Sequence, residues 1–363
     1  MEEGLSHPYR GLPEHMFWKS AVEDQAPQSF DPVIDSKLRI SRHDVVAAAG
    51  SCFAQHIARH LVASGFNYLQ AEPPKTPSEP IFSAQYGNVY TIRQLRQLLL
   101  RAYGLHRPTD IAWRRDDGKW IDPLRPQMFP EGFLSPAEVE AAAIEHLRAV
   151  RRVFEESRVF VFTLGLTESW MAEDGTIVPI PPGVVAVETT GGRYSFHNFT
   201  AVEMINEMGR FIADFRGVNP EAHVILTVSP VPLVATYENR HVLVSNTYSK
   251  SALRVVAEEA ARANDNVTYF PSYEIIMSPS VRFGYFCSDL RSVTDVGVSH
   301  VMQIFARHFL QESDVTTAEP SHCTVRVEAP ESKVLVSSEL QKSFQQIEGI
   351  LCDEELLHAG GGR

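Results

Sequence analysis

Four almost continuously apolar runs, each followed directly by a turn-forming residue, constrain the fold of this chain more than any other feature. They are Val45–Ala49 before Gly50, Val159–Leu164 before Gly165, Val224–Val228 before Ser229-Pro230, and Val267–Phe270 before Pro271. The runs do not alternate apolar with polar residues, which is typical of parallel strands that are covered on both faces. We therefore expect them to form one central parallel sheet.

Helical patterns lie between these runs. Phe53, Ile57 and Leu61 follow the first run at i, i+4, i+8 spacing, and Gly65 supplies a stop. Further helices are predicted at about 136–156, 200–215 and 247–263, with a last one at about 295–310. Because strands and helices alternate, a doubly wound α/β domain is the simplest arrangement.

The composition divides the chain into three parts. Residues 1–43 are rich in proline and polar residues and predict an irregular lead-in, residues 44–310 hold the α/β pattern, and residues 311–363 form an acidic appendage. One amphipathic helix is expected in that appendage, with an apolar stripe of Leu340, Phe344, Ile347 and Leu351. Inside the domain, residues 71–90 and 104–135 predict long loops, which are often functional.

Charge and cysteine content exclude several classes of protein. The net charge of −12 makes nucleic acid a poor partner. No stretch approaches the roughly 20 apolar residues that span a bilayer, and the acidic N-terminus lacks the apolar core of a signal peptide, so we expect a cytoplasmic protein. The four cysteines show no CxxC spacing, and the acidic residues form no metal pattern, so we predict free thiols and neither metal nor other cofactor.

The reactive centre is expected where the strands end, because ligands of open α/β sheets bind beyond the carboxyl ends of the strands. Gly50-Ser51-Cys52 ends the first strand and also opens a helix. A helix N-terminus lowers the pKa of a thiol and suits an oxyanion. Both side chains also have structural alternatives: Ser51 as a helix N-cap and Cys52 as a small buried apolar residue.

The stretch Ala-Gly-Ser-Cys-Phe-Ala-Gln at 49–55 resembles the signature of the GSCFA-domain family. Similar stretches follow in the same order as in that family, at 86–91, 162–168, 227–232, 248–251 and 269–274. The family is grouped with the SGNH (GDSL-like) hydrolases. The resemblance therefore implies a three-layer α/β/α, flavodoxin-like fold and, by analogy, ester hydrolysis or acyl transfer.

The resemblance also assigns residues, although the superfamily pattern fits only in part. It places Cys52 at the nucleophile and Ser51 at the preceding aspartate, with Gly87 and Asn88 at the oxyanion hole. In the third block, Thr167 replaces the amide donor and Glu168 ends the motif. The last block keeps Asp289 but has Ser292 where the histidine belongs.

No general base is therefore assigned, because a serine cannot serve as one near neutral pH. His241 is the candidate we retain, with His197 as an alternative. His300 lies opposite the apolar stripe of its predicted helix, so we expect it to be a solvated surface residue. Either another histidine enters the site or the protein is not a hydrolase.

Three functions compete at this point. The leading one is an esterase or acyltransferase that acts on a small or glycan-linked acyl group through a covalent acyl-enzyme. The alternative is a non-catalytic, ligand-binding SGNH-like scaffold with Asp289 and Glu168 as polar lining. A third is redox sensing at Cys52, for which no resolving cysteine lies nearby in sequence.

Overall fold

The computed structural model describes residues 7–74, 80–282, 284–311 and 352–359. Its centre is a four-stranded parallel sheet in the order β1-β4-β9-β10. The strands are β1 (Val46–Gly50), β4 (Val159–Leu164), β9 (His223–Val228) and β10 (Val267–Tyr269). Each coincides with one of the apolar runs to within one residue at either end, so the predicted parallel sheet is confirmed.

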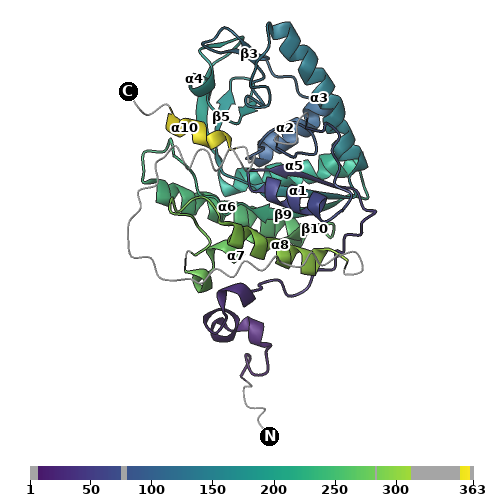
Figure 1. Cartoon of the computed structure of the whole chain (residues 1–363), viewed down its shortest axis with the longest axis vertical. Helices are drawn as coiled ribbons and strands as arrows, with labels where there is room; N and C mark the ends of the chain where they lie inside the picture. The colour runs from purple at the N-terminus through teal and green to yellow at the C-terminus, as the bar shows by residue number, and fades with distance from the viewer. Residues whose placement is uncertain (1–6, 75–79, 283, 312–351, 360–363) are drawn as a thin grey trace.

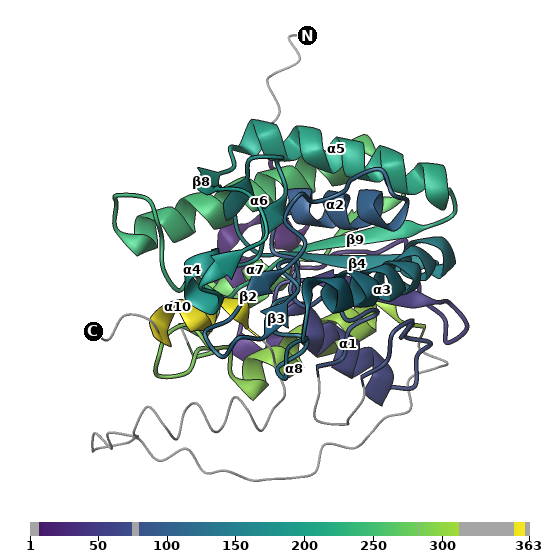
Figure 2. The ribbon, with the colours of Figure 1, turned by 90° about the horizontal axis from the view of Figure 1, so that it is seen from above.

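Helices cover both faces of this sheet and give three layers (Figures 1 and 2). One face carries α1 (Ala54–Ala63), α7 (Ser272–Met277) and α8 (Asp295–Phe309). The other carries α2 (Ile92–Ala102), α3 (Pro136–Glu156), α5 (Ala201–Val218) and α6 (Val242–Ala263). Successive residues of β4 alternate between the two layers: Phe160 packs in one core and Val161 in the other. The predicted three-layer α/β/α fold is confirmed.

The five helices predicted within the domain are present, whereas α2 and the short helices α4 (Pro182–Val185) and α7 were not predicted. Helix α6 begins at Val242, five residues before the predicted start. Helix α2 was not predicted, because it lies between the two long Pro- and Gly-rich stretches. It begins with a capping box between Thr91 and Gln94 and buries Leu95 and Leu99 in the core.

Two small antiparallel sheets lie beside the main one. One joins β2 (Trp113–Arg114) to β3 (Trp120–Ile121) and β7 (Glu188–Thr189). The other joins β5 (Glu168–Ala172) to β6 (Ile177–Val178) and β8 (Tyr194–Asn198), and α4 (Pro182–Val185) lies between β6 and β7 in the chain. A separate apolar cluster forms around the fully buried Trp113, so much of 104–135 is ordered by packing.

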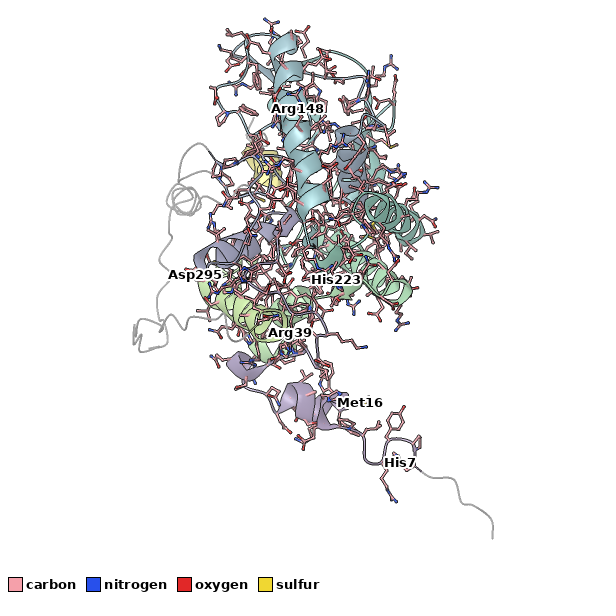
Figure 3. The ribbon with its side chains drawn as sticks, turned by 90° about the vertical axis from the view of Figure 1, so that its right-hand side faces the viewer. His7, Met16, Arg39, Arg148, His223 and Asp295 are labelled. Carbon is pink, nitrogen blue, oxygen red and sulfur yellow. The ribbon has the colours of Figure 1, made fainter. Side chains whose placement is uncertain are left out.

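The two ends of the described chain differ. Near the N-terminus, short turns form at Glu14–Met16, Lys19–Glu23 and Pro27–Ser29. The chain at His7 and Met16 extends away from the α/β body (Figure 3), whereas the Val22 and Pro27 carbonyls accept hydrogen bonds from Ser280 and Tyr285 of the body. By contrast, the C-terminal segment, residues 352–359, packs on the body (Figure 1). It consists of a turn at Asp353–Glu355 and helix α10 (Leu356–Ala359), whose Leu356 and Leu357 contact the Trp113 cluster.

Two sequence expectations remain to be placed. The predicted apolar stripe at Leu340–Leu351 lies outside the described residues. Within the described ranges, none of the helices combines the length and apolarity needed to cross a bilayer.

Gly50 gives the first test of this fold. Its φ of +144° is unfavourable for other residues, and a Cβ there would lie 2.5 Å from the Thr163 carbonyl oxygen. We expect Gly50→Ala to lower the free energy of unfolding by about 2 kcal/mol or more, measured by urea denaturation. Gly209→Ala is the matched control, because that helical position has open space and alanine favours helix. Equal stability of the two variants would contradict the close approach of β1 and β4.

Candidate active site

The turn between β1 and α1 carries the two predicted nucleophiles. Ser51 N donates to the Thr163 carbonyl at 3.1 Å, which holds the turn against β4. Helix α1 starts at Ala54 without a side-chain cap, so Ser51 is not its N-cap. Instead, the Ser51 hydroxyl is buried and makes no hydrogen bond with any described residue. An uncompensated buried hydroxyl is uncommon, and a catalytic role is one explanation for it.

Gly165 brings a second and a third segment to this turn. A Cβ at Gly165 would lie 3.2 Å from Ser51 Cβ and 3.1 Å from the Tyr90 carbonyl oxygen. Gly165 N donates to that same carbonyl at 3.0 Å, and Val89 N donates to the Gly50 carbonyl at 2.8 Å. The ends of β1 and β4 and the chain at 88–90 therefore meet.

Asn88 points its amide donor into the site. It follows Gly87, whose φ of +69° turns the chain here. The side-chain oxygen of Asn88 accepts from Gln55 Nε2 at 3.3 Å, so the Asn88 Nδ2 points away from Gln55. That nitrogen donates to Asp353 Oδ2 at 2.9 Å.

Asp353 belongs to the C-terminal segment, and its buried carboxyl group occupies the site. Besides Asn88, Gln127 Nε2 donates to its Oδ1, and its backbone N donates to the Tyr90 hydroxyl at 3.0 Å. Burial raises the pKa of this carboxyl group, and the hydrogen bonds from Asn88 and Gln127 oppose that rise. Two side-chain amides thus converge on one carboxylate beside the β1–α1 turn.

Cys352 and Glu354, the neighbours of Asp353 in the chain, lie beside Cys52 and Arg291. The Cys52 thiol lies beside Cys352, which raises the pKa of Cys52, and Arg291 Nη2 donates to Cys352 Sγ at 3.7 Å. Arg291 also pairs with Glu354, with 3.2 Å between Nη2 and Oε2, and its Nε donates to the Pro232 carbonyl at 3.1 Å. The C-terminal segment therefore lies directly on the predicted catalytic turn.

The position of Cys352 corrects the expectation for Cys52. A helix N-terminus predicts a lowered pKa for Cys52, but the hydrogen bond to Cys352 and burial raise the pKa of its thiol. In Cys352 the hydrogen bond from Cys52 lowers the thiol pKa, with help from the Arg291 charge and against the effect of burial. Cys352 is therefore the more acidic member of the pair.

Lys250 is a site residue that sequence reasoning missed. It projects from α6, is 2% exposed, and donates from Nζ to the Gly165 carbonyl at 2.7 Å. Burial lowers its pKa to about 8, whereas the interactions with Glu354 and Cys52 act in the opposite direction. The only signal in the sequence was the Tyr-Ser-Lys-Ser stretch at 248–251, which carried the family resemblance but no assigned role.

Thr167 and Glu168 are held in place by other elements. Thr167 is fully buried; its backbone N donates to Ser249 Oγ at 3.1 Å and its hydroxyl donates to Asn198 Oδ1 at 2.7 Å. Glu168 accepts from the Thr236 hydroxyl at 2.6 Å and from Tyr237 N at 3.1 Å, so its carboxylate orders the loop before α6. Thr167 lies near the site because it follows Gly165 by two residues, whereas the Glu168 carboxylate faces the loop at 236–237.

The other predicted residues lie in local structures. Asp289 is exposed and accepts from Ser292 Oγ at 2.6 Å and from the backbone of Arg291 and Ser292, which closes its own turn. His241 is exposed and caps α6, with its Nδ1 accepting from Leu243 N at 3.1 Å. His197 pairs with Glu203 at 3.2 Å. None of these contacts joins Asp289, His241 or His197 to Cys52.

The expectation for His300 was wrong. It is 7% exposed and its Nδ1 shares a 2.8 Å hydrogen bond with the Tyr285 hydroxyl, because Tyr285 and the chain near Phe30 cover the side of α8 that periodicity assigns to solvent. Burial lowers the pKa of its imidazole. Helical periodicity could not reveal this cover.

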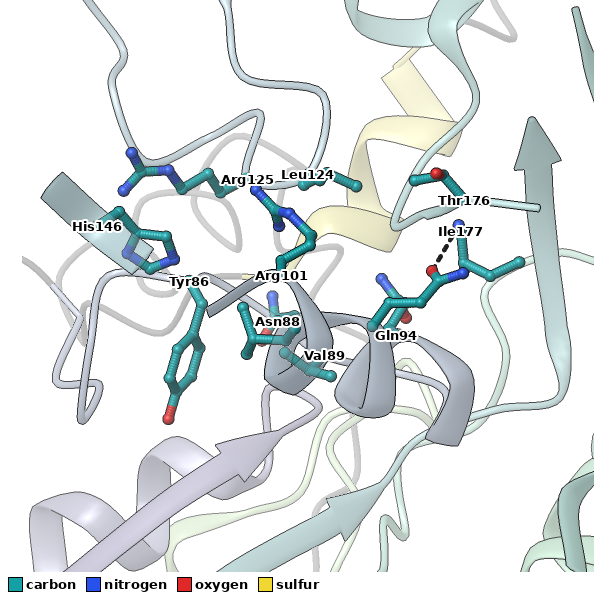
Figure 4. Close-up of a pocket in the computed structure, with 12 residues that line it drawn as sticks. Tyr86, Asn88, Val89, Gln94, Arg101, Leu124, Arg125, His146, Thr176 and Ile177 are labelled. Atoms are coloured by element: carbon teal, nitrogen blue, oxygen red, sulfur yellow. Dashed lines mark hydrogen bonds between the residues drawn. The ribbon is translucent and has the colours of Figure 1, made fainter. Parts of the chain in front are cut away.

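A polar pocket opens next to Asn88, lined in part by Arg101, Arg125 and His146 (Figure 4). The charges beside it are paired: Arg125 Nε lies 2.8 Å from Asp122 Oδ2, and His146 Nδ1 lies 2.6 Å from Glu72 Oε2. Burial lowers the pKa of His146 to about 4, so its imidazole is neutral near pH 7. Among the described residues, no group of three or more His, Cys, Asp or Glu side chains could hold a metal ion.

Comparisons with known proteins follow from this geometry. No curated protein matches the chain. Among solved structures, it is similar to a carbohydrate esterase family 2 enzyme with a carbohydrate-binding domain from Corynascus thermopiles (Myceliophthora fergusii), at 12% identity and a TM-score of 0.29. The match covers 76% of this chain and 66% of that one, just under two thirds of its length. This similarity is too low to support an inference about activity.

The family comparison is more extensive. The model of the GSCFA family matches residues 45–305, which contain the sheet, the β1–α1 turn, Asn88, Lys250 and Arg291. The match covers well over half of the chain, and the resemblance seen at residues 49–55 is confirmed. The chain belongs to the GSCFA family.

Proposed function

We propose that this protein is an esterase or acyltransferase that acts on a small or glycan-linked acyl group through a covalent acyl-enzyme. The nucleophile is Cys52, with Ser51 as the alternative, and Lys250 acts as the general base in place of a histidine. The oxyanion is bound by Asn88 with Gln127. The family membership and the contacts around Asp353 support this assignment.

The observation that carries the proposal is the buried carboxyl group of Asp353. Its two oxygens accept from the side-chain amides of Asn88 and Gln127, and Cys352, the preceding residue, contacts Cys52. Amide donors that bind the oxygens of an acidic group beside a nucleophile are the kind of donor that the oxyanion of a tetrahedral acyl intermediate requires. A substrate acyl group needs this same place, so catalysis requires the C-terminal segment to leave it.

In this proposal Lys250 supplies the general base that a histidine provides in related enzymes. A Cys52 thiol with a raised pKa needs a base, and a buried lysine whose pKa is about 8 can be partly neutral near physiological pH. Lys250 binds the carbonyl of Gly165, and Gly165 packs against Ser51, the residue before Cys52, which supports the proximity of Lys250 and Cys52. Catalytic sites with lysine as the base of a hydroxyl nucleophile are a recognised variant of the triad.

The proposed reaction has two stages. Neutral Lys250 takes the Cys52 proton as the sulfur attacks the acyl carbon, and the resulting oxyanion is held by Asn88 and Gln127. When the intermediate collapses, the ester C–O bond breaks and the Lys250 ammonium returns the proton to the leaving alkoxide. In the second stage an acceptor hydroxyl or amine attacks the thioester carbon while Lys250 takes its proton. The C–S bond then breaks, and the Cys52 sulfur takes the proton back from Lys250. A bound sugar or amine acceptor is favoured over water by its fixed position.

The nucleophile can be identified with p-nitrophenyl acetate in the presence and absence of sugar or amine acceptors. We expect Cys52→Ala to lower kcat/KM by about 10²-fold or more, and Ser51→Ala to have a smaller effect. Cys287→Ala is the matched control, since Cys287 is exposed. Unchanged rates for both Cys52→Ala and Ser51→Ala would leave the ligand-binding scaffold as the better interpretation.

Lys250 predicts a specific pH profile. Only its neutral form accepts a proton, so the rate should rise about tenfold per pH unit at low pH and level off above a pH of about 8. Lys250→Met should lower the rate by about 10²-fold and remove this dependence after subtraction of the Cys52→Ala background. Lys250→Arg is the control that keeps the charge but not the base. An unshifted profile in both variants would exclude Lys250 as the base and leave it a structural role.

A further inference from the structure

Two cysteines that are 300 positions apart in sequence meet in the site. Cys52 lies at the turn before α1, and Cys352 opens the C-terminal segment; both thiols are free. The residue after Cys352, Asp353, donates from its backbone N to the Tyr90 hydroxyl at 3.0 Å, and Tyr90 packs with Ser51 around Gly165. The Cys352 thiol lies close enough to Cys52 to raise the pKa of the Cys52 thiol. The contact is fixed on both sides. Cys52 is held by the sheet edge, and Cys352 is held by Asp353 in its amide pocket and by Leu356 in the Trp113 cluster.

The two thiols differ in their surroundings. Cys352 is half-buried and accepts a hydrogen bond from Arg291, whose guanidinium favours a thiolate. Cys52 is only 6% exposed and donates its proton toward Cys352. A small oxidant therefore reaches the more acidic and more accessible sulfur first, with the second thiol already in contact with it.

We propose that Cys352 and Cys52 form a reversible disulfide when the protein meets a peroxide, with Cys352 as the attacking thiolate and Cys52 as the resolving thiol. This bond fixes the C-terminal segment over the β1–α1 turn, and the Cys52 sulfur is then no longer available as a nucleophile. The proposal rests on the placement of the two sulfurs and Arg291, and it holds whether or not the protein has esterase activity.

The chemistry balances with peroxide as the only added reactant. The Cys352 thiolate attacks one peroxide oxygen, the O–O bond breaks, and hydroxide leaves and takes up the proton that Cys352 had released. Cys352 is now a sulfenic acid. The Cys52 sulfur attacks the Cys352 sulfur, the S–O bond breaks, and the hydroxide leaves as water with the Cys52 proton. Two thiols are oxidised to one disulfide, and one peroxide is reduced to two waters.

The test uses the reduced full-length chain and hydrogen peroxide at about one equivalent. After the remaining thiols are blocked with N-ethylmaleimide, unreduced proteolytic peptides are identified by mass spectrometry. We expect a peptide pair that joins Cys52 to Cys352, two hydrogens lighter than the sum and separated again by dithiothreitol. In guanidinium chloride this pair should form at least about tenfold more slowly, because unfolding removes the contact and the Arg291 partner.

Variants separate the roles of the two thiols. Cys287→Ser should form the same link at the parent rate, since Cys287 is exposed and outside the pair. In Cys52→Ser the Cys352 sulfenic acid should persist and be trapped by dimedone, whereas Cys352→Ser should lose the link. Preferential linkage of Cys52 to Cys287 or Cys323, oxidation of Cys352 to a sulfinic acid with Cys52 still free, or an equal rate in the unfolded chain would each overturn the proposal. The readout is a mass, so it stays informative if no esterase activity is found.

Discussion

At the carboxyl edge of the sheet, the backbone of Gly50 runs so close to Thr163 that a Cβ at Gly50 would overlap the neighbouring strand. A second close approach lies at the end of β4, where a Cβ at Gly165 would lie 3.0 Å from the Tyr90 ring and 3.2 Å from Ser51 Cβ. These two close approaches bring three stretches of backbone to one point. The Ser51 hydroxyl, the Cys52 thiol and the Asn88 amide owe their proximity to them, and Lys250 reaches the same point by binding the Gly165 carbonyl.

Much of the fold could be predicted because the central strands are buried on both faces, and such burial leaves a direct record in sequence. Phe160 and Val161 pack into opposite cores, so both positions are apolar. Helix α2 was not recognised, since its short apolar stripe lies between stretches rich in proline and glycine. His300 was misplaced for a different reason: periodicity describes a helix by itself, whereas Tyr285 covers the polar side of α8.

The site was predictable only where its residues are close in the chain or match a motif. Ser51, Cys52, Gly87 and Asn88 were identified in this way, and the structure brings the turn and Asn88 together. Lys250 resembles a surface lysine until α6 is seen to direct it under the end of β4. The pairing of Cys52 with Cys352 depends on the path of the whole chain, which no local pattern records. Conversely, Asp289 fits a motif frame and His241 was retained as a candidate base, but they have local turn and capping roles.

The carboxyl groups of the C-terminal segment also affect how firmly that segment is held. Burial raises the pKa of both Asp353 and Glu354. Each group therefore binds a proton more readily when the segment is docked than when it is free, so protonation favours docking at acidic pH and this contribution is lost as the pH rises. Cys352, with its lowered pKa, acts in the opposite sense, and Arg291 compensates part of the charge of Glu354. Docking is thus linked to proton uptake by the two carboxyl groups, and at neutral pH their desolvation keeps the docked and free forms closer in free energy than the many contacts alone would suggest.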